Sequence, residues 1–93
     1  MIEVKEYFDG KVKSFVINST EGKKTVGAMS PGEYEFDTET KETMTVVSGE
    51  ISVYFAEDDD WEEFGVGASF DVPGKSKLKV KVTQDSAYLC EYE

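Results

Sequence analysis

The amino-acid sequence contains no histidine and no arginine, because all ten of its basic residues are lysines. Without histidine, neither a Ser-His-Asp triad nor a histidine-activated cysteine can form. The imidazole ligands with which proteins usually bind Zn²⁺, Fe²⁺ or Ni²⁺ are also missing. Without arginine, no side chain offers a bidentate fork for phosphate, so lysines, backbone N–H groups or hydroxyls must hold any anion.

Disulfides, long apolar runs and positive charge are also lacking. The single cysteine, Cys90, excludes an internal disulfide. No apolar run approaches the ~20 residues of a membrane-spanning helix, and charges at Glu3, Lys5 and Glu6 leave no signal-peptide core. The formal net charge of −10 disfavours nucleic acid and anionic membranes as partners. We therefore expect a cytoplasmic protein that binds neither.

A period of two dominates what is present. Segments such as "KVKSFVI", "TMTVV" and "KLKVKV" alternate in polarity, and turn signals such as "DG", "SPGE" and "PGKS" separate them. No window shows a sustained helical period. The pattern predicts about nine short strands. We expect residues 1–93 to form a single all-β domain, an antiparallel barrel of the jelly-roll type.

Glu42 is the first candidate for chemistry. It stands seven positions before Gly49, a glycine suited to a tight hairpin turn, and it shares a strand face with Met44 and Val46. If that face is the barrel interior, burial raises the pKa of the Glu42 carboxyl and makes it a proton donor. The alternative, a solvated residue at the end of a loop, remains equally open from the sequence.

Aromatic residues form the second group of candidates. Most must fill the core of so small a barrel, and a subset lining a cavity would stack on a planar ring. In "GASFDVPG", residues 67–74, Phe70 and Val72 share one face, and Pro73 ends the strand because it cannot donate to a ladder.

Four lysines follow at alternate positions, and the period places them on one strand face: Lys75, Lys77, Lys79 and Lys81. Such lysines either attract an anion or guard an exposed strand against edge-to-edge pairing. We expect guarding for Lys79 and Lys81. Lys75 and Lys77 follow the Pro-Gly turn at a barrel mouth, so both interpretations remain open for them.

Two of these segments together resemble the two motifs of the cupin superfamily. The matching positions are Gly32, Glu42 and Gly49 in the first motif, and Gly67, Pro73 and Gly74, with one residue fewer, in the second. The positions of the motif histidines, within Glu35 to Thr38 and near Lys77, hold no histidine. The resemblance implies a cupin barrel that has kept one carboxylate and lost its imidazole metal ligands.

Longer strings are similar to the pyrimidine/purine nucleoside phosphorylase family of small cupins over nearly the whole chain. They include "EYFDGKVKS", "TVGAM", "GEYEF", "ETMTVVSGEI", "GASFDVPG" and "SAYLCEY". The resemblance implies phosphate-dependent cleavage of purine and pyrimidine nucleosides to the free base and α-ribose 1-phosphate. Phosphate is then a co-substrate, and we expect no metal or other cofactor, because positioning and electrostatics can carry this reaction.

In a reaction of that kind, we expect Glu42 to stabilise the sugar cation or to hold a ribose hydroxyl. The residues that we expect to hold the nucleoside are Tyr34, Phe36, Met44, Phe70 and Tyr88. The ring faces among them would sandwich the base without reading its edge, which suits broad specificity. The candidates for phosphate are Lys23, Lys75 and Lys77.

The chain departs from the family that it resembles at two positions where the resemblance implies arginine, which hold Lys23 and Glu91 here. Alternation with Cys90 predicts that Glu91 lies on the opposite strand face from Tyr88 and Tyr92. Two other interpretations remain open: a non-catalytic cupin that binds a small ligand, and a dimerising interaction domain. Because cupins commonly pair through sheet faces, we also expect a homodimer.

Overall fold

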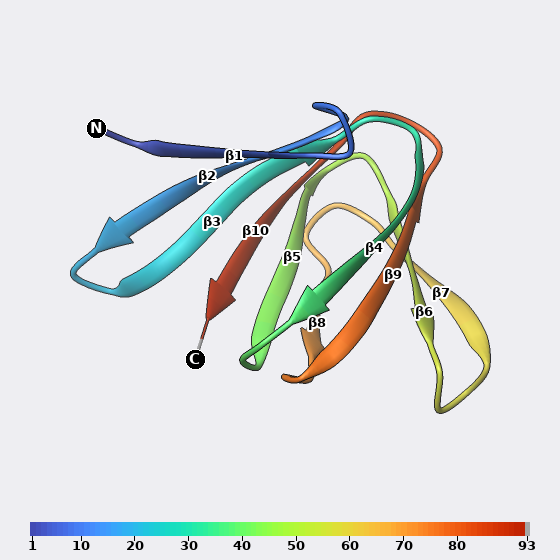
Figure 1. The fold of residues 1–93 in the computed structure, drawn as a ribbon. Coiled ribbons are helices and arrows are strands. Elements are labelled where there is room, and N and C mark those ends of the chain that lie inside the picture. Colours follow the sequence, from blue (N-terminus) through green and yellow to red (C-terminus); the bar gives the residue numbers. More distant parts are fainter. Residues whose placement is uncertain (93) are drawn as a thin grey trace.

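The computed structural model describes residues 1–92, which form ten strands and no helix (Figure 1). In chain order the strands are β1 (Glu3–Tyr7), β2 (Val12–Ser19), β3 (Gly22–Met29), β4 (Gly32–Thr38), β5 (Glu42–Ser48), β6 (Ile51–Phe55), β7 (Asp60–Phe64), β8 (Ser69–Val72), β9 (Ser76–Val82) and β10 (Ser86–Tyr92). The all-β prediction is confirmed, with one strand more than the turn signals indicated. Glu93, the last residue of the predicted domain, lies outside the described residues.

The strands form two antiparallel sheets. One has the order β1-β2-β3-β10-β5-β8, and the other has the order β4-β9-β6-β7. Figure 1 shows the long β2–β3 hairpin reaching away from the β6–β7 hairpin, which lies at the opposite end of the molecule. Within the described residues there is no helix long and apolar enough to cross a membrane.

The core lies between the inner faces of the two sheets, as the period of two predicts. On β9, Leu78, Val80 and Val82 are buried, whereas Lys79 between them is exposed. Met44 and Val46 of β5 are buried opposite them in the same apolar cluster. Alternation along each strand therefore assigned the inner residues correctly here, because successive side chains of a strand point to opposite faces.

The guarding role expected for Lys79 and Lys81 is wrong, because β9 is not an edge strand. It pairs with β4 on one side and with β6 on the other. The ammonium of Lys79 lies 5.4 Å from the centroid of the Tyr54 ring, and that of Lys81 lies 4.6 Å from the Trp61 ring. These lysines pack over aromatic faces on the outside of a central strand.

Gly49 makes the turn after β5, at the position expected of it. Its φ of +78° lies in the left-handed region, which favours glycine. A side chain here would also meet the Ser86 hydroxyl and would lie 2.7 Å from the carbonyl oxygen of Asp85. The turn therefore requires glycine for two independent reasons.

Candidate functional site

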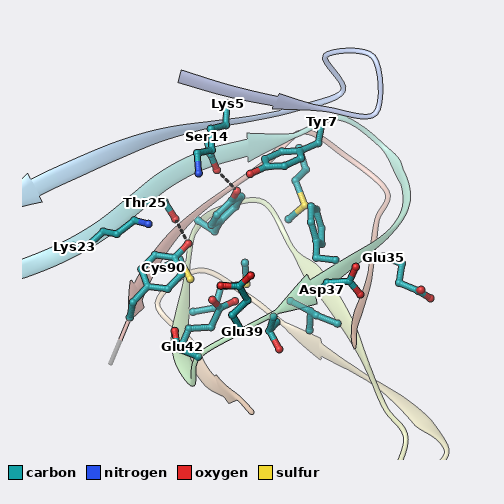
Figure 2. Close-up of a pocket in the computed structure, with 18 of the residues that line it drawn as sticks. Lys5, Tyr7, Ser14, Lys23, Thr25, Glu35, Asp37, Glu39, Glu42 and Cys90 are labelled. Atoms are coloured by element: carbon teal, nitrogen blue, oxygen red, sulfur yellow. Dashed lines mark hydrogen bonds between the residues drawn. The ribbon is translucent and has the colours of Figure 1, made fainter. Parts of the chain in front are cut away.

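A cavity of about 1000 Å³ opens between the six-stranded sheet and β4 (Figure 2). Its lining comes from seven strands and the loops beside them: Lys5, Tyr7 and Phe8; Ser14; Gly22, Lys23, Thr25 and Met29; Glu35, Phe36, Asp37, Thr38, Glu39 and Thr40; Glu42 and Met44; Leu78; and Tyr88, Cys90 and Tyr92. This volume is at the upper end of the range for small-molecule sites, about 300–1,000 Å³.

The inner face of β10 forms the floor of the cavity with Tyr88, Cys90 and Tyr92. The Tyr88 hydroxyl lies 2.6 Å from the Ser14 hydroxyl, and the Tyr92 hydroxyl lies 3.0 Å from that of Thr25. Both partners lie on other strands of the same sheet, so the two phenol rings are held across the sheet. The floor is thus a row of hydroxyls with a thiol between them.

Gly27 of β3 makes room for one of these phenols. It lies opposite Tyr88 in the β3–β10 ladder and opposite Ser14 in the β2–β3 ladder. A Cβ on Gly27 would lie 2.5 Å from the Tyr88 hydroxyl oxygen and 2.7 Å from the Lys13 carbonyl oxygen. Because side chains essentially never approach so closely, a glycine is what allows Tyr88 to reach Ser14.

Glu42 is the first residue of β5, half-buried, and its side chain lines the cavity. The solvated-loop alternative is therefore wrong, since Glu42 pairs with Val72 and with Tyr92 in the sheet. Burial raises the pKa of the Glu42 carboxyl above its ordinary value, and a hydrogen bond with Cys90 partly opposes that rise. A raised pKa brings the carboxyl closer to the operating pH, which is what a proton donor needs.

Cys90 lies next to Glu42 and is not set up as a nucleophile. Burial, and then the neighbouring Glu42 carboxylate, raise the pKa of the Cys90 thiol to about 12. A thiol with that pKa is protonated near neutral pH, and only the thiolate attacks. Cys90 therefore contributes a hydrogen bond to Glu42 and not covalent chemistry.

The structure brings together four of the predicted nucleoside and catalytic residues. Phe36, Glu42, Met44 and Tyr88 all line the cavity. Phe36 packs edge-on against Tyr7, with ring centroids 6.1 Å apart, so two aromatic rings stand at the β1–β4 side. The four predicted residues come from three strands, β4, β5 and β10, and alternation had placed their side chains on inner faces.

Tyr34 and Phe70 are placed elsewhere. Both are buried, but neither lines the cavity. The Tyr34 hydroxyl donates to the Ser30 carbonyl oxygen at 2.6 Å, and the Phe70 ring stacks on Phe64 with centroids 4.5 Å apart. Each is an inward-facing aromatic residue, as expected, but its neighbours leave it in the core.

The three lysines predicted for phosphate also separate. Lys23 lines the cavity, and its ammonium lies 5.4 Å from the centroid of the Tyr92 ring. Lys75 and Lys77 are exposed and do not line it. Lys77 forms ion pairs with Asp37 at 3.2 Å and with Glu35 at 3.4 Å. Its charge is therefore used to neutralise two carboxylates of β4.

Sequence reasoning missed the contribution of β1 and of the small hydroxyls. Lys5 and Tyr7 line the cavity from β1, and Ser14 and Thr25 line it from β2 and β3. Alternation along "EVKEY" does place Lys5 and Tyr7 on one face. Which face looks into a cavity, however, depends on pairing between β1 and β2, which no local pattern shows.

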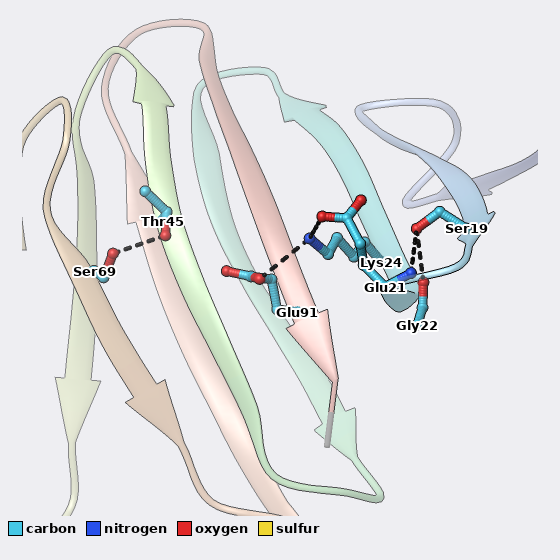
Figure 3. Close-up of polar contacts among 7 residues, drawn as sticks. All are labelled: Ser19, Glu21, Gly22, Lys24, Thr45, Ser69 and Glu91. Carbon is cyan, nitrogen blue, oxygen red and sulfur yellow. Dashed lines mark hydrogen bonds and ion pairs between the residues drawn. The ribbon is translucent and has the colours of Figure 1, made fainter.

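Glu91 lies on the outer face of β10, as predicted (Figure 3). Its carboxylate is 3.4 Å from the Lys24 ammonium, which is also 3.8 Å from the Glu21 carboxylate. Glu91 does not line the cavity. A glutamate in place of the arginine that the resemblance implies at this position therefore affects an outer surface and leaves the cavity floor as described. Among residues 1–92, no group of three or more Cys, Asp or Glu side chains is placed to hold a metal ion.

Comparison with known proteins gives consistent matches over the full length. The family model for pyrimidine/purine nucleoside phosphorylase matches residues 2–92. Proteins of that name from Pseudomonas entomophila and Pseudomonas syringae pv. tomato are 53% and 51% identical over 92 residues. The matches cover 99% of this chain and 98% and 99% of those relatives.

Solved structures give the same result for the fold. A protein of unknown function from Vibrio parahaemolyticus superposes with a TM-score of 0.95 at 43% identity, covering 100% of this chain and 99% of that one. A putative ethanolamine utilization protein from Salmonella typhimurium, at 11% identity, superposes with a TM-score of 0.76 over 99% of this chain and 93% of its own, and shares the fold alone. This chain belongs to the pyrimidine/purine nucleoside phosphorylase family.

Proposed function

We propose that the protein cleaves purine and pyrimidine nucleosides with inorganic phosphate, giving the free base and α-ribose 1-phosphate. One observation carries the proposal: a half-buried Glu42 with a raised pKa lies in a nucleoside-sized cavity beside Phe36 and Tyr88. The names of the full-length relatives support it. The chemistry asks for a positioned phosphate, a stabilised sugar cation and a proton for the departing base, and these residues address the last two.

The bond changes follow from the products. A phosphate oxygen forms a bond to C1′ of the ribose as the bond from C1′ to the base nitrogen breaks, and the electron pair stays on the base. The Glu42 carboxylic acid donates its proton to that nitrogen. Hydrogen phosphate loses one proton on forming the ester, and this proton restores Glu42 through solvent. A positioned general acid of this kind contributes typically 10²–10⁴-fold in rate.

Broad specificity is consistent with the side chains around the cavity. Its lining within residues 1–92 contains no asparagine or glutamine, the side chains that recognise base edges by paired donors and acceptors. Phe36 and Met44 offer instead an aromatic face and a flexible thioether. Such contacts hold a purine or a pyrimidine ring through its faces, and they discriminate weakly between bases.

The decisive experiment is a base-release assay on a panel of nucleosides that includes uridine and inosine. We expect uracil and hypoxanthine to appear only when phosphate is present, together with ribose 1-phosphate detected by ³¹P NMR. No base above the buffer control across the whole panel would refute the proposal and favour a non-catalytic ligand-binding cupin. We propose also that the reaction needs no metal, and loss of activity in EDTA would contradict that part.

Association into a homodimer is a separate proposal for the same protein. Exposed apolar side chains on the outer face of the six-stranded sheet lie opposite one another in its ladders, namely Val4, Phe15 and Val26. Covering this row with a second copy would remove it from water, which favours association. Light scattering that gives the mass of one chain at micromolar concentration would contradict the dimer.

A further inference from the structure

We propose that inorganic phosphate binds on the β1–β3 side of the cavity, between the ammonium groups of Lys5 and Lys23 and against the Tyr88 hydroxyl. The inference rests on the proposed function, because it places the second substrate of that reaction. It assigns the main charge to Lys5, a residue that no motif in the sequence singles out.

The strand register places Lys5 at the end of a row across the inner face of the six-stranded sheet. Lys5 lies opposite Ser14, Ser14 opposite Gly27, and Gly27 opposite Tyr88. Cross-strand partners share a face, so all four positions face the cavity side. The Tyr88 phenol extends over Gly27 to reach Ser14, and Figure 2 shows the Lys5 side chain beside Ser14. Lys5 therefore stands at the hydroxyl end of the phenol.

The charges of Lys5 and Lys23 are not neutralised by carboxylates. Within the described part of the chain neither lysine forms an ion pair, whereas Lys13, Lys24 and Lys77 each form at least one. Within the described residues, Lys5 and Lys23 are also the two lysines that line the cavity, so neither ammonium group of the lining is paired with a carboxylate. Two such ammonium groups on one side of a concave site attract an anion.

The hydroxyl pair beside Lys5 supplies a donor as well. Ser14 and Tyr88 each carry one hydroxyl proton, and the 2.6 Å bond between them uses only one of the two. Burial raises the pKa of the Tyr88 hydroxyl, so it stays protonated near neutral pH. The second proton of the pair is available to a phosphate oxygen, so the site offers both charge and a hydrogen bond without any arginine.

The opposite side of the cavity carries carboxyl groups and, among the described residues, none of the lysines that line the cavity, so it suits the leaving base better than phosphate. Its carboxylates come from β4, the following loop and β5, namely Glu35, Asp37, Glu39 and Glu42. In Figure 2 they lie across the pocket from Lys5 and Lys23. A β-nucleoside gives an α-phosphate only when phosphate attacks C1′ from the face opposite the base. Phosphate on the lysine side therefore directs the base toward Glu42, the proposed acid.

Phosphate binding measured without any turnover tests the site directly. Titration of inorganic phosphate followed by ³¹P NMR should show weakening by roughly tenfold or more in Lys5→Gln and in Lys23→Gln, because each loses a charged hydrogen bond. Lys5→Arg should keep most of the affinity, since it keeps the charge. Lys11→Gln is the matched control: Lys11 is exposed and away from the cavity, so its affinity should equal that of the unaltered chain.

Kinetics separate this inference from the proposed function. In Lys5→Gln the KM for phosphate should rise by about the same factor, while the KM for the nucleoside changes less than about twofold. Phosphate affinity and KM unchanged in both lysine variants, in a chain that cleaves nucleosides, would overturn the phosphate site alone. Phosphate binding that depends on Lys5 in a chain that releases no base would support the site and refute the phosphorylase activity.

Discussion

The two faces of β10 carry different polar side chains in different surroundings. On the inner face, Tyr88, Cys90 and Tyr92 form the cavity floor, and the pKa values of all three are raised, mainly by burial. On the outer face, Glu91 forms a partly exposed ion pair with Lys24. The chain alternates between these environments at every residue. The comparison teaches that the inner face uses its polar groups under burial, which raises the pKa values there, whereas the outer face uses its carboxylate in an ion pair.

Glu42→Gln against Glu91→Gln is the largest expected contrast between an inner and an outer carboxylate. Glutamine keeps the shape of glutamate but cannot donate the carboxylic proton, so kcat of Glu42→Gln should fall by about 100-fold or more. Glu91→Gln should keep kcat, because Glu91 does not line the cavity. Steady-state kinetics on inosine or uridine measure both. An equal rate in a folded Glu42→Gln chain would leave Glu42 structural.

Gly27→Ala against Gly65→Ala extends the comparison to the backbone behind the inner face. The new methyl at Gly27 would press on the Tyr88 hydroxyl and on the Lys13 carbonyl, whereas nothing lies within 4 Å of a methyl at Gly65. Overpacking of this kind typically costs about 1–3 kcal/mol. Denaturant melts should therefore show destabilisation for Gly27→Ala only. Equal stability of the two variants would show that Tyr88 moves aside freely.

Tyr88→Phe against Ser69→Ala compares two hydroxyl pairs of similar length. The inner pair, Ser14 with Tyr88 at 2.6 Å, is buried, and the outer pair, Thr45 with Ser69 at 2.7 Å, is exposed (Figure 3). Removing the Tyr88 hydroxyl leaves a buried partner unsatisfied, which costs about 1–3 kcal/mol. Water replaces the lost partner in the outer pair, so Ser69→Ala should change the free energy of unfolding by less than about 0.5 kcal/mol. Similar losses in both variants would contradict the role assigned to burial.

The pH dependence of stability gives the smallest expected effect. The folded pKa of Glu42 lies above its ordinary value of 4.5, so the stability linked to its protonated form is complete below that value. This contribution is lost as the pH rises through the raised pKa. Glu42→Gln cannot ionise, so it should gain stability relative to the unaltered chain over that interval. Because Glu42 is half-exposed and screened, the gain should stay under about 1 kcal/mol. Unfolding midpoints at pH 4 and pH 7 measure it, and a loss of relative stability on raising the pH would contradict the sign.

The inner positions of Met44, Phe36 and Tyr88 were predictable from the sequence, whereas that of Glu42 stayed open between a strand and a loop end. Alternation along a strand fixes which residues share a face, and the inner face of a small barrel is the one rich in apolar side chains. The place of Lys5 was not predictable in the same way. Every residue of β1 is exposed, so its sequence carries no apolar stripe to mark the inner side.

The errors have a related cause. Lys79 and Lys81 have the pattern of edge-strand lysines, yet β9 lies between β4 and β6. Tyr34 and Phe70 face inward like Phe36, but local contacts with Ser30 and Phe64 keep them out of the cavity. In each case a correct assignment of the face was not enough, because the neighbour across the sheet or core decided the role.

By itself, the sequence determined the all-β fold, the inner and outer faces of its strands, and the absence of imidazole and guanidinium chemistry. These follow from local periodicity and from composition. Only the tertiary structure decided that Tyr88 reaches Ser14, 74 positions away in the chain, and that Lys5 and Lys23 face one cavity. The physical reason is that strand pairing joins distant segments, and the register between them is set by the packing of the whole core.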